Sequence, residues 1–159
     1  MIGKLRLKGH VTIEQYRDGA LIDKREGHNL VTTVGEAWMA GALTGDVADP
    51  TLMKYIGLGT GTDAAATTDT TLGTEVTTGG ADEARATGTQ SRQTTTHTND
   101  TYQAVGTVTF NSSHAVTEAG LFSAASSGSM FARQVFAAIN AVSGDTLQIT
   151  WKVASFADA

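Results

Sequence analysis

Short segments in which apolar and polar residues alternate recur along this chain, and they constrain its fold more than any other feature. A period of two places successive side chains on opposite faces of a strand, so each segment predicts a half-buried β-strand. The first segment covers residues 4–16, and the Asp-Gly pair in Arg17-Asp-Gly-Ala20 then predicts a hairpin turn. A return strand is expected from about residue 21 to residue 31. The apolar residues that share the first segment's phase are Leu5, Leu7, Val11 and Ile13, and Tyr16 ends the segment.

Further segments of this kind follow, bounded by turn signals such as Ser126-Ser-Gly128 and Ser143-Gly-Asp145. Threonine, a β-branched residue that favours strands, occurs 26 times, whereas proline occurs once. About eight short strands with regular turns predict an all-β fold, either an antiparallel β-sandwich or a jelly-roll-like barrel. The later strands are expected at residues 52–58, 101–110, 115–123, 129–138 and 145–156.

A chain of 159 residues is long enough to bury a core of its own, so a single barrel or sandwich is expected over residues 29–159. Residues 1–28 are expected to form a strand pair that either belongs to this barrel or extends from it as an arm toward a neighbour.

One short helix is expected at about residues 34–44. Thr33-Val-Gly-Glu36 has the spacing of a capping box, apolar residues then recur at helical spacing, and Gly45 is a helix terminator. Within this helix, Trp38 is expected to cover an open end of the barrel and not to stack on a ligand.

Two long segments, residues 59–71 and 77–100, contain mainly small and polar residues. They are expected to be surface loops, with residues 87–98 forming a polar strand that is wet on both faces or paired to another subunit. Since these segments lack apolar anchors, we expect packing against sister subunits to order them.

Composition argues against several classes of protein. The net charge is −5 and no basic tract is present, so nucleic-acid binding is not expected. No apolar run approaches the ~20 residues of a membrane span. Without cysteine, and with four histidines at no recognised metal-binding spacing, no metal site is expected, and no cofactor. Asp63, Asp69 and Glu75 leave calcium binding open, although solvated loop acids are the favoured interpretation.

The sequence also argues against an enzyme. Gly57-Leu-Gly-Thr-Gly61 lacks the following helix of a dinucleotide site, and no Gly-x-Ser-x-Gly element occurs. Glu118 lies in a predicted strand and would need a partner if buried, and Arg133 on the next strand is the natural candidate. An architectural or interface salt bridge between Glu118 and Arg133 is favoured over surface exposure of both residues, and catalysis is the least favoured role.

Five short motifs, taken in order, resemble those of small structural proteins of tailed bacteriophages. The resemblance covers residues 29–156 approximately. The motifs are Tyr55-Ile-Gly-Leu-Gly-Thr-Gly-Thr-Asp63, Asp69-Thr-Thr-Leu-Gly-Thr-Glu75, Val116-Thr-Glu-Ala-Gly-Leu-Phe122, Met130-Phe-Ala-Arg133 and Thr146-Leu-Gln-Ile-Thr-Trp-Lys-Val153.

The resemblance implies a virion protein, and the leading hypothesis is a capsid decoration protein on the outer surface of the head, assembled in the host cytoplasm. Its expected partners are the major capsid protein of the same virion and copies of itself, most simply as a homotrimer. A tail, baseplate or fibre-attachment protein is the alternative. A carbohydrate-binding module is a second alternative, disfavoured because only 6% of residues are aromatic and most fall in predicted strands.

The N-terminal strand pair is expected to contact other molecules, because six of the eleven Lys and Arg residues lie in the first 25 positions. A basic segment on an acidic protein suits an acidic neighbour, and edge strands pair readily with other chains. The expected contact residues are Leu5, Arg6, Leu7, Val11, Ile13 and Tyr16.

Overall fold

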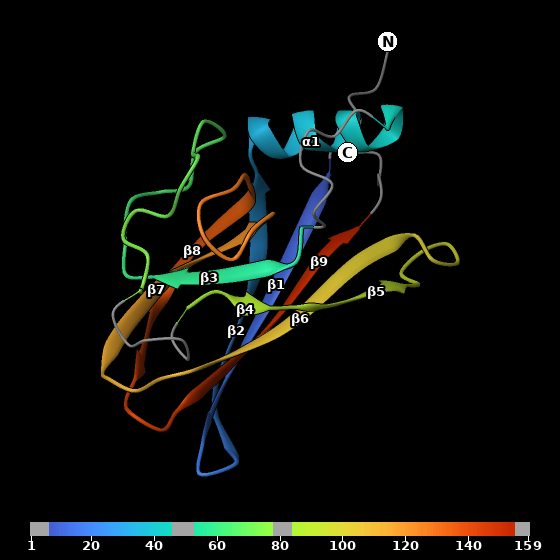
Figure 1. Ribbon diagram of the computed structural model, residues 1–159. Coiled ribbons are helices and arrows are strands. Elements are labelled where there is room, and N and C mark those ends of the chain that lie inside the picture. The colour runs from blue at the N-terminus through green and yellow to red at the C-terminus, as the bar shows by residue number, and fades with distance from the viewer. Residues whose placement is uncertain (1–6, 46–52, 78–83, 155–159) are drawn as a thin grey trace.

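The computed structural model describes residues 7–45, 53–77 and 84–154, which form nine strands and one helix (Figure 1). The strands are β1 (Lys8–Arg17), β2 (Ala20–Val31), β3 (Tyr55–Gly59), β4 (Ala86–Thr87), β5 (Thr89–Gln93), β6 (Thr101–Thr109), β7 (His114–Phe122), β8 (Met130–Ala141) and β9 (Thr146–Ala154). The helix is α1 (Thr33–Thr44).

The strands form one antiparallel sheet in the order β4-β3-β7-β8-β2-β1-β9-β6-β5. This sheet curls into a nearly closed barrel, with α1 lying across one end and the β1–β2 hairpin projecting at the other (Figure 1). The expected all-β class with one short helix is therefore confirmed. Within the described residues no helix has the length and apolar character needed to cross a membrane.

Strand β1 lies inside the sheet, paired with β2 along one edge and with β9 along the other. Its side chains alternate as the sequence predicts, so that Val11 and Ile13 are each only 1% exposed. The expectation that this strand offers a free edge is wrong, because both of its edges are already hydrogen-bonded. The N-terminal pair is part of the barrel, and the boundary expected between residues 28 and 29 falls within β2.

The two edges of the sheet come together at β4 and β5, which are separated only by Gly88. Strand β4 pairs with β3, and β5 pairs with β6. The backbone N–H of Gly88 donates to the Lys54 carbonyl at 2.7 Å. A Cβ at position 88 would lie 2.8 Å from that oxygen, which explains the glycine. Of the polar strand expected at residues 87–98, only residues 89–93 form β5, which pairs with β6 of the same chain, and residues 94–98 lie outside any strand.

The core fills the space between the two halves of the barrel, and its largest fully buried side chains include Trp151 and Phe110. Strand β9 contributes on alternate positions, as expected for a half-buried strand, whereas β7 is buried at every position from Val116 to Phe122. This difference puts Glu118, which lies in the middle of β7, inside the molecule.

Helix α1 ends at Gly45 in the left-handed conformation, as the sequence predicts, but its cap is Thr32 and not Thr33. The Thr32 hydroxyl accepts a hydrogen bond from the Gly35 N–H at 2.9 Å. Trp38 is half-buried and packs edge-to-face on Phe131, with ring centroids 6.2 Å apart. Of the helix residues only Gly35 is buried, so α1 rests on the barrel through few contacts.

Candidate functional site

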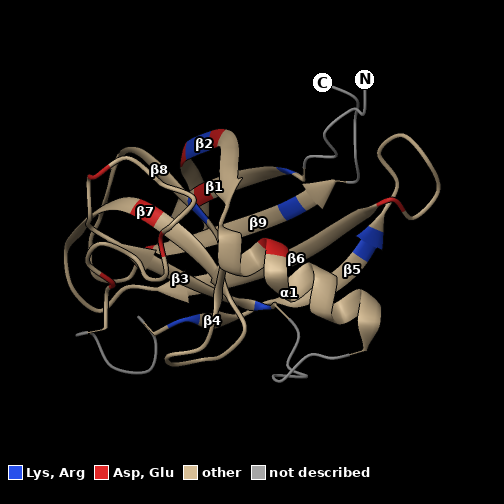
Figure 2. Cartoon of the chain, turned by 90° about the horizontal axis from the view of Figure 1, so that it is seen from above, with Lys and Arg blue, Asp and Glu red and all other residues tan. Residues whose placement is uncertain are grey.

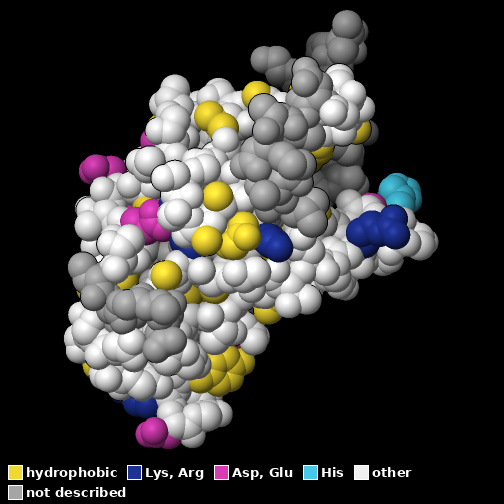
Figure 3. All heavy atoms as spheres, viewed as in Figure 1, with side chains coloured by type: hydrophobic (Ala, Val, Ile, Leu, Met, Phe, Trp, Pro, Cys, Tyr) yellow, Lys and Arg dark blue, Asp and Glu magenta, His cyan; other side chains and the backbone are white. Residues whose placement is uncertain are grey.

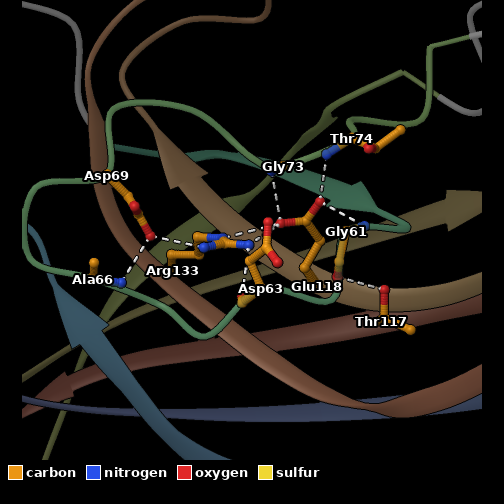
Figure 4. A network of polar contacts seen from close by, with 9 residues as sticks. All are labelled: Gly61, Asp63, Ala66, Asp69, Gly73, Thr74, Thr117, Glu118 and Arg133. Carbon is orange, nitrogen blue, oxygen red and sulfur yellow. Dashed lines mark hydrogen bonds and ion pairs between the residues drawn. The ribbon is translucent and has the colours of Figure 1, made fainter.

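The most unusual group in the molecule is the Glu118 carboxylate, which is 0% exposed and accepts hydrogen bonds from both sides (Figure 4). Its Oε1 accepts the backbone N–H groups of Gly61 at 2.9 Å and Thr74 at 2.8 Å. Its Oε2 accepts the N–H of Gly73 at 3.0 Å. Beside it, the Thr117 hydroxyl donates to the Gly61 carbonyl at 2.7 Å. One carboxylate thus binds both ends of the loop that follows β3.

Arg133, on the neighbouring strand β8, completes this cluster. Its Nη2 lies 2.8 Å from Glu118 Oε2 and its Nε donates to the same oxygen at 3.0 Å. Its Nη1 donates to Asp69 Oδ2 at 2.7 Å, and its Nη2 also donates to the Asp63 carbonyl at 3.1 Å. The structure therefore brings the two sequence-predicted residues, Glu118 and Arg133, into direct contact. The third charged member, Asp69, approaches from the loop, and its pairing with Arg133 was not predicted from the sequence.

The environment keeps these groups charged. Burial raises the pKa of Glu118, but hydrogen bonds from Thr74, Gly73, Arg133 and Gly61 outweigh burial, and the net pKa is lowered. Burial lowers the pKa of Arg133, but its bonds to Asp69 and Glu118 outweigh that effect and raise it. The pKa of Asp69 is lowered, mainly by the hydrogen bond from the Ala66 N–H. We refer to Glu118, Arg133 and Asp69 as the buried ionic cluster.

The segment from Thr60 to Val76, called the 60–76 loop below, is ordered by contacts within its own chain. Glu118 binds the two ends of the loop, and Arg133 binds Asp69 in its middle. The Thr67 carbonyl of the loop also accepts a hydrogen bond from the backbone N–H of Thr33 at 2.8 Å. Order within the single chain is a correction to the expectation that sister subunits would supply the packing. The expectation was wrong because the loop is anchored through its own backbone N–H groups and Asp69 to side chains on β7 and β8, and no pattern within the loop indicates these contacts.

Two further carboxylate–arginine pairs hold loops in place. Arg85 binds Glu75 of the 60–76 loop through Nε and Nη2, and its Cζ lies 3.4 Å from the centroid of the Phe122 ring. Arg17 binds the buried Asp145 carboxylate with two hydrogen bonds of 2.7 and 2.8 Å. The Arg17 guanidinium and burial act in opposite directions on the pKa of Asp145, and the net pKa is lowered. Arg17 and Asp145 are 128 positions apart, whereas Arg85 and Glu75 are 10 apart, and neither spacing is a recognisable sequence signal.

The buried ionic cluster has a structural role, which is to hold the 60–76 loop against strands β7 and β8. Glu118 is saturated with hydrogen bonds and has no exposed surface, so it offers no access to a substrate. Of the acids considered for calcium, Asp69 is held by Arg133 and Glu75 by Arg85. In the described part of the chain, no group of three or more His, Asp or Glu side chains could hold a metal ion.

The expected contact residues of the N-terminal segment lie in different environments. Leu5 and Arg6 fall outside the described residues, and Val11 and Ile13 belong to the core. Tyr16 is half-buried near the hairpin. Leu7 is half-buried beside an apolar cavity of about 650 Å³ between α1 and the barrel end, which Trp38 and Phe131 also line.

Charge is sparse over the described surface. Lys and Arg residues are interspersed with Asp and Glu along the ribbon (Figure 2), and the face seen in Figure 3 shows mainly backbone and uncharged polar side chains, with apolar side chains between them. Comparison of the chain with models of protein families, with curated proteins and with solved structures found no match.

Proposed function

We propose that this chain is a non-enzymatic virion structural protein of a tailed bacteriophage that decorates the capsid and bridges neighbouring capsomers. The observation that carries the proposal is that four of the five resembling motifs contribute residues to one cluster. Gly61 belongs to the first motif, Asp69, Gly73 and Thr74 to the second, and Glu118 and Arg133 to the third and fourth. All six residues take part in one hydrogen-bonded cluster (Figure 4). The motifs therefore describe one structural device.

The buried ionic cluster supports a binding role because it fixes the conformation of an exposed loop. Burying a charged pair costs free energy, and well-packed apolar residues of similar volume often serve stability equally well. The pair is thus better explained by what it positions than by stability alone. Loops of more than about 12–15 residues without secondary structure are commonly functional.

The surface of the 60–76 loop suits contact with another protein. Its exposed side chains are mainly threonine and alanine, and Asp69 is neutralised by Arg133. Small side chains lose little rotamer freedom when an interface covers them. Threonine hydroxyls supply hydrogen bonds to a partner's backbone without a charge to desolvate.

In this proposal several copies act together. A homotrimer would present three such loops, and linking weak contacts raises the overall affinity without requiring a large interface from any one copy. The basic residues near the N-terminus, among them Lys4 and Arg6, add attraction to an acidic capsid surface.

The direct test is cosedimentation of the purified chain with heads assembled from the major capsid protein of the same virion, and separately with tails. Attachment to heads is expected, and the double variant Thr68→Glu/Thr70→Glu should weaken it at least about tenfold because it places negative charges on the loop opposite an acidic surface. Thr107→Glu, at an exposed threonine on β6, is the matched control. Attachment to tails alone would establish the tail alternative, and attachment to neither would overturn the proposal.

A further inference from the structure

Two of the four histidines face each other across the β1–β2 pair. His10 and His28 are direct partners in the antiparallel register, and both project from the outer face of the barrel, since the buried residues of β1 are its odd-numbered ones. Their ring centroids lie 5.8 Å apart with the rings at 77° to each other. His10 is half-buried and His28 is exposed, so both are accessible to solutes.

This separation fits two imidazoles that share one metal ion. A zinc ion sits about 2.0–2.1 Å from a histidine nitrogen, so two rings bound to the same ion at tetrahedral or wider angles have centroids roughly 5–6 Å apart. The observed pair falls within that range. Rotation of the two side chains would be enough to aim one nitrogen from each ring at a common point.

The surroundings leave the two rings free for this role. Within the described residues no hydrogen bond joins either imidazole to the protein, so their shared contact is the main interaction that holds them. Lys152 is the neighbour of His10 in the register on β9, and Glu26 lies two residues from His28 on the same face. The Glu26 carboxylate lies 2.8 Å from Lys24 Nζ and is paired with that lysine.

We propose that His10 and His28 form a two-histidine site for a divalent transition-metal ion, with water in the remaining coordination positions. Imidazole ligands favour zinc, nickel and copper over magnesium or calcium. A bound ion would link β1 to the part of β2 that lacks a second partner, since β2 pairs with β8 only through Leu30 and Val31. The site would therefore stabilise the projecting hairpin, a role independent of capsid attachment.

The test is calorimetric titration of zinc chloride into the full chain, prepared without a polyhistidine tag. One zinc ion per chain is expected, and His10→Ala or His28→Ala should each weaken binding at least about tenfold by removing one of two ligands. His97→Ala, in an exposed turn, is the matched control and should bind as the parent does. Magnesium chloride should give no heat of binding.

A second measurement separates loss of the site from loss of the fold. Zinc should raise the thermal unfolding midpoint of the parent and of His97→Ala, but not of His10→Ala, whose circular dichroism should match the parent. Absence of zinc binding in the parent, or binding that persists in both His10→Ala and His28→Ala, would overturn the proposal. In either case the pair would be a simple edge-to-face ring contact.

Discussion

Arg133 binds one oxygen of the Glu118 carboxylate through two of its nitrogens: Nε and Nη2 lie 3.0 and 2.8 Å from Glu118 Oε2. The other carboxylate oxygen, Oε1, accepts hydrogen bonds from backbone N–H groups only. The carboxylate thereby connects strand β8 to the 60–76 loop through the interior of the molecule. Removal of either partner would leave the other charged and buried.

Glu118→Gln should lower the free energy of unfolding by about 3 kcal/mol, because it removes one charge of a buried pair and leaves Arg133 with Asp69 alone. The matched control is Glu26→Gln, an exposed residue, which should have little effect. Urea denaturation measures both. The backbone N–H groups of Gly61, Gly73 and Thr74 should exchange faster with solvent in Glu118→Gln. Unchanged exchange at these three positions would show that Glu118 does not hold the 60–76 loop.

Stability should decline in acid. The pKa values of Glu118, Asp69 and Asp145 are lowered in the folded state from ordinary values of 4.5, 3.8 and 3.8. The contribution of these carboxylates to the free energy of unfolding is therefore fully present above about pH 5 and is lost as the pH falls through their lowered folded-state pKa values. Urea midpoints should be nearly constant from pH 7 to about pH 5 and should fall below about pH 4. Asp145→Asn should reduce the steepness of that fall, and an equal slope would exclude Asp145 as a contributor.

Gly35→Ala should destabilise the protein although alanine favours helices by roughly 1 kcal/mol over glycine. A Cβ at position 35 would lie 2.2 Å from the Phe131 carbonyl oxygen, so α1 would have to move off the barrel. Overpacking of this kind costs about 1–3 kcal/mol. Near-ultraviolet circular dichroism should report a changed Trp38–Phe131 contact. The control Ala37→Gly, at an exposed helix position, measures the propensity effect alone, and a stabilised Gly35→Ala would show that α1 is not seated as described.

Deletion of residues 1–16 should unfold the chain, because it removes β1 from the middle of the sheet together with the core residues Val11 and Ile13. Deletion of residues 1–6 is the informative truncation. It should leave the circular dichroism spectrum unchanged and weaken attachment to heads, since Leu5 and Arg6 belong to the proposed contact. The double variant Lys4→Ala/Arg6→Ala tests the charge alone. Full attachment by the truncated chain would remove the N-terminal segment from the proposed interface.

Analytical ultracentrifugation tests the proposed homotrimer. The free chain should sediment as a trimer at micromolar concentration if its threonine-rich surfaces associate around a three-fold axis. A monomer would make assembly dependent on the capsid lattice, and a dimer or hexamer would contradict the trimer.

The fold class and the boundaries of several elements could be predicted because they depend on local pattern. Alternation along β1 and β9 gave the correct buried face, and Gly45 gave the end of α1. The cap was placed one residue late, because Thr32 and Thr33 are both able to cap and only Thr32 lies beside the Phe131 backbone, to which it is hydrogen-bonded. The contact between Glu118 and Arg133 was anticipated from the need of a buried carboxylate for a partner.

What the sequence by itself determined about this protein is therefore its all-β character, the short helix α1 and the buried faces of its alternating strands, because these follow from interactions between near neighbours. Tertiary structure alone decided that β1 lies inside the sheet, that Asp69 joins Glu118 and Arg133, and that His10 meets His28. The place of β1 and the Asp69 contact depend on packing between segments far apart in the chain, which leaves no local pattern in either segment. The His10–His28 contact depends on the register of the β1–β2 hairpin, including its irregularity at Gln15/Tyr16.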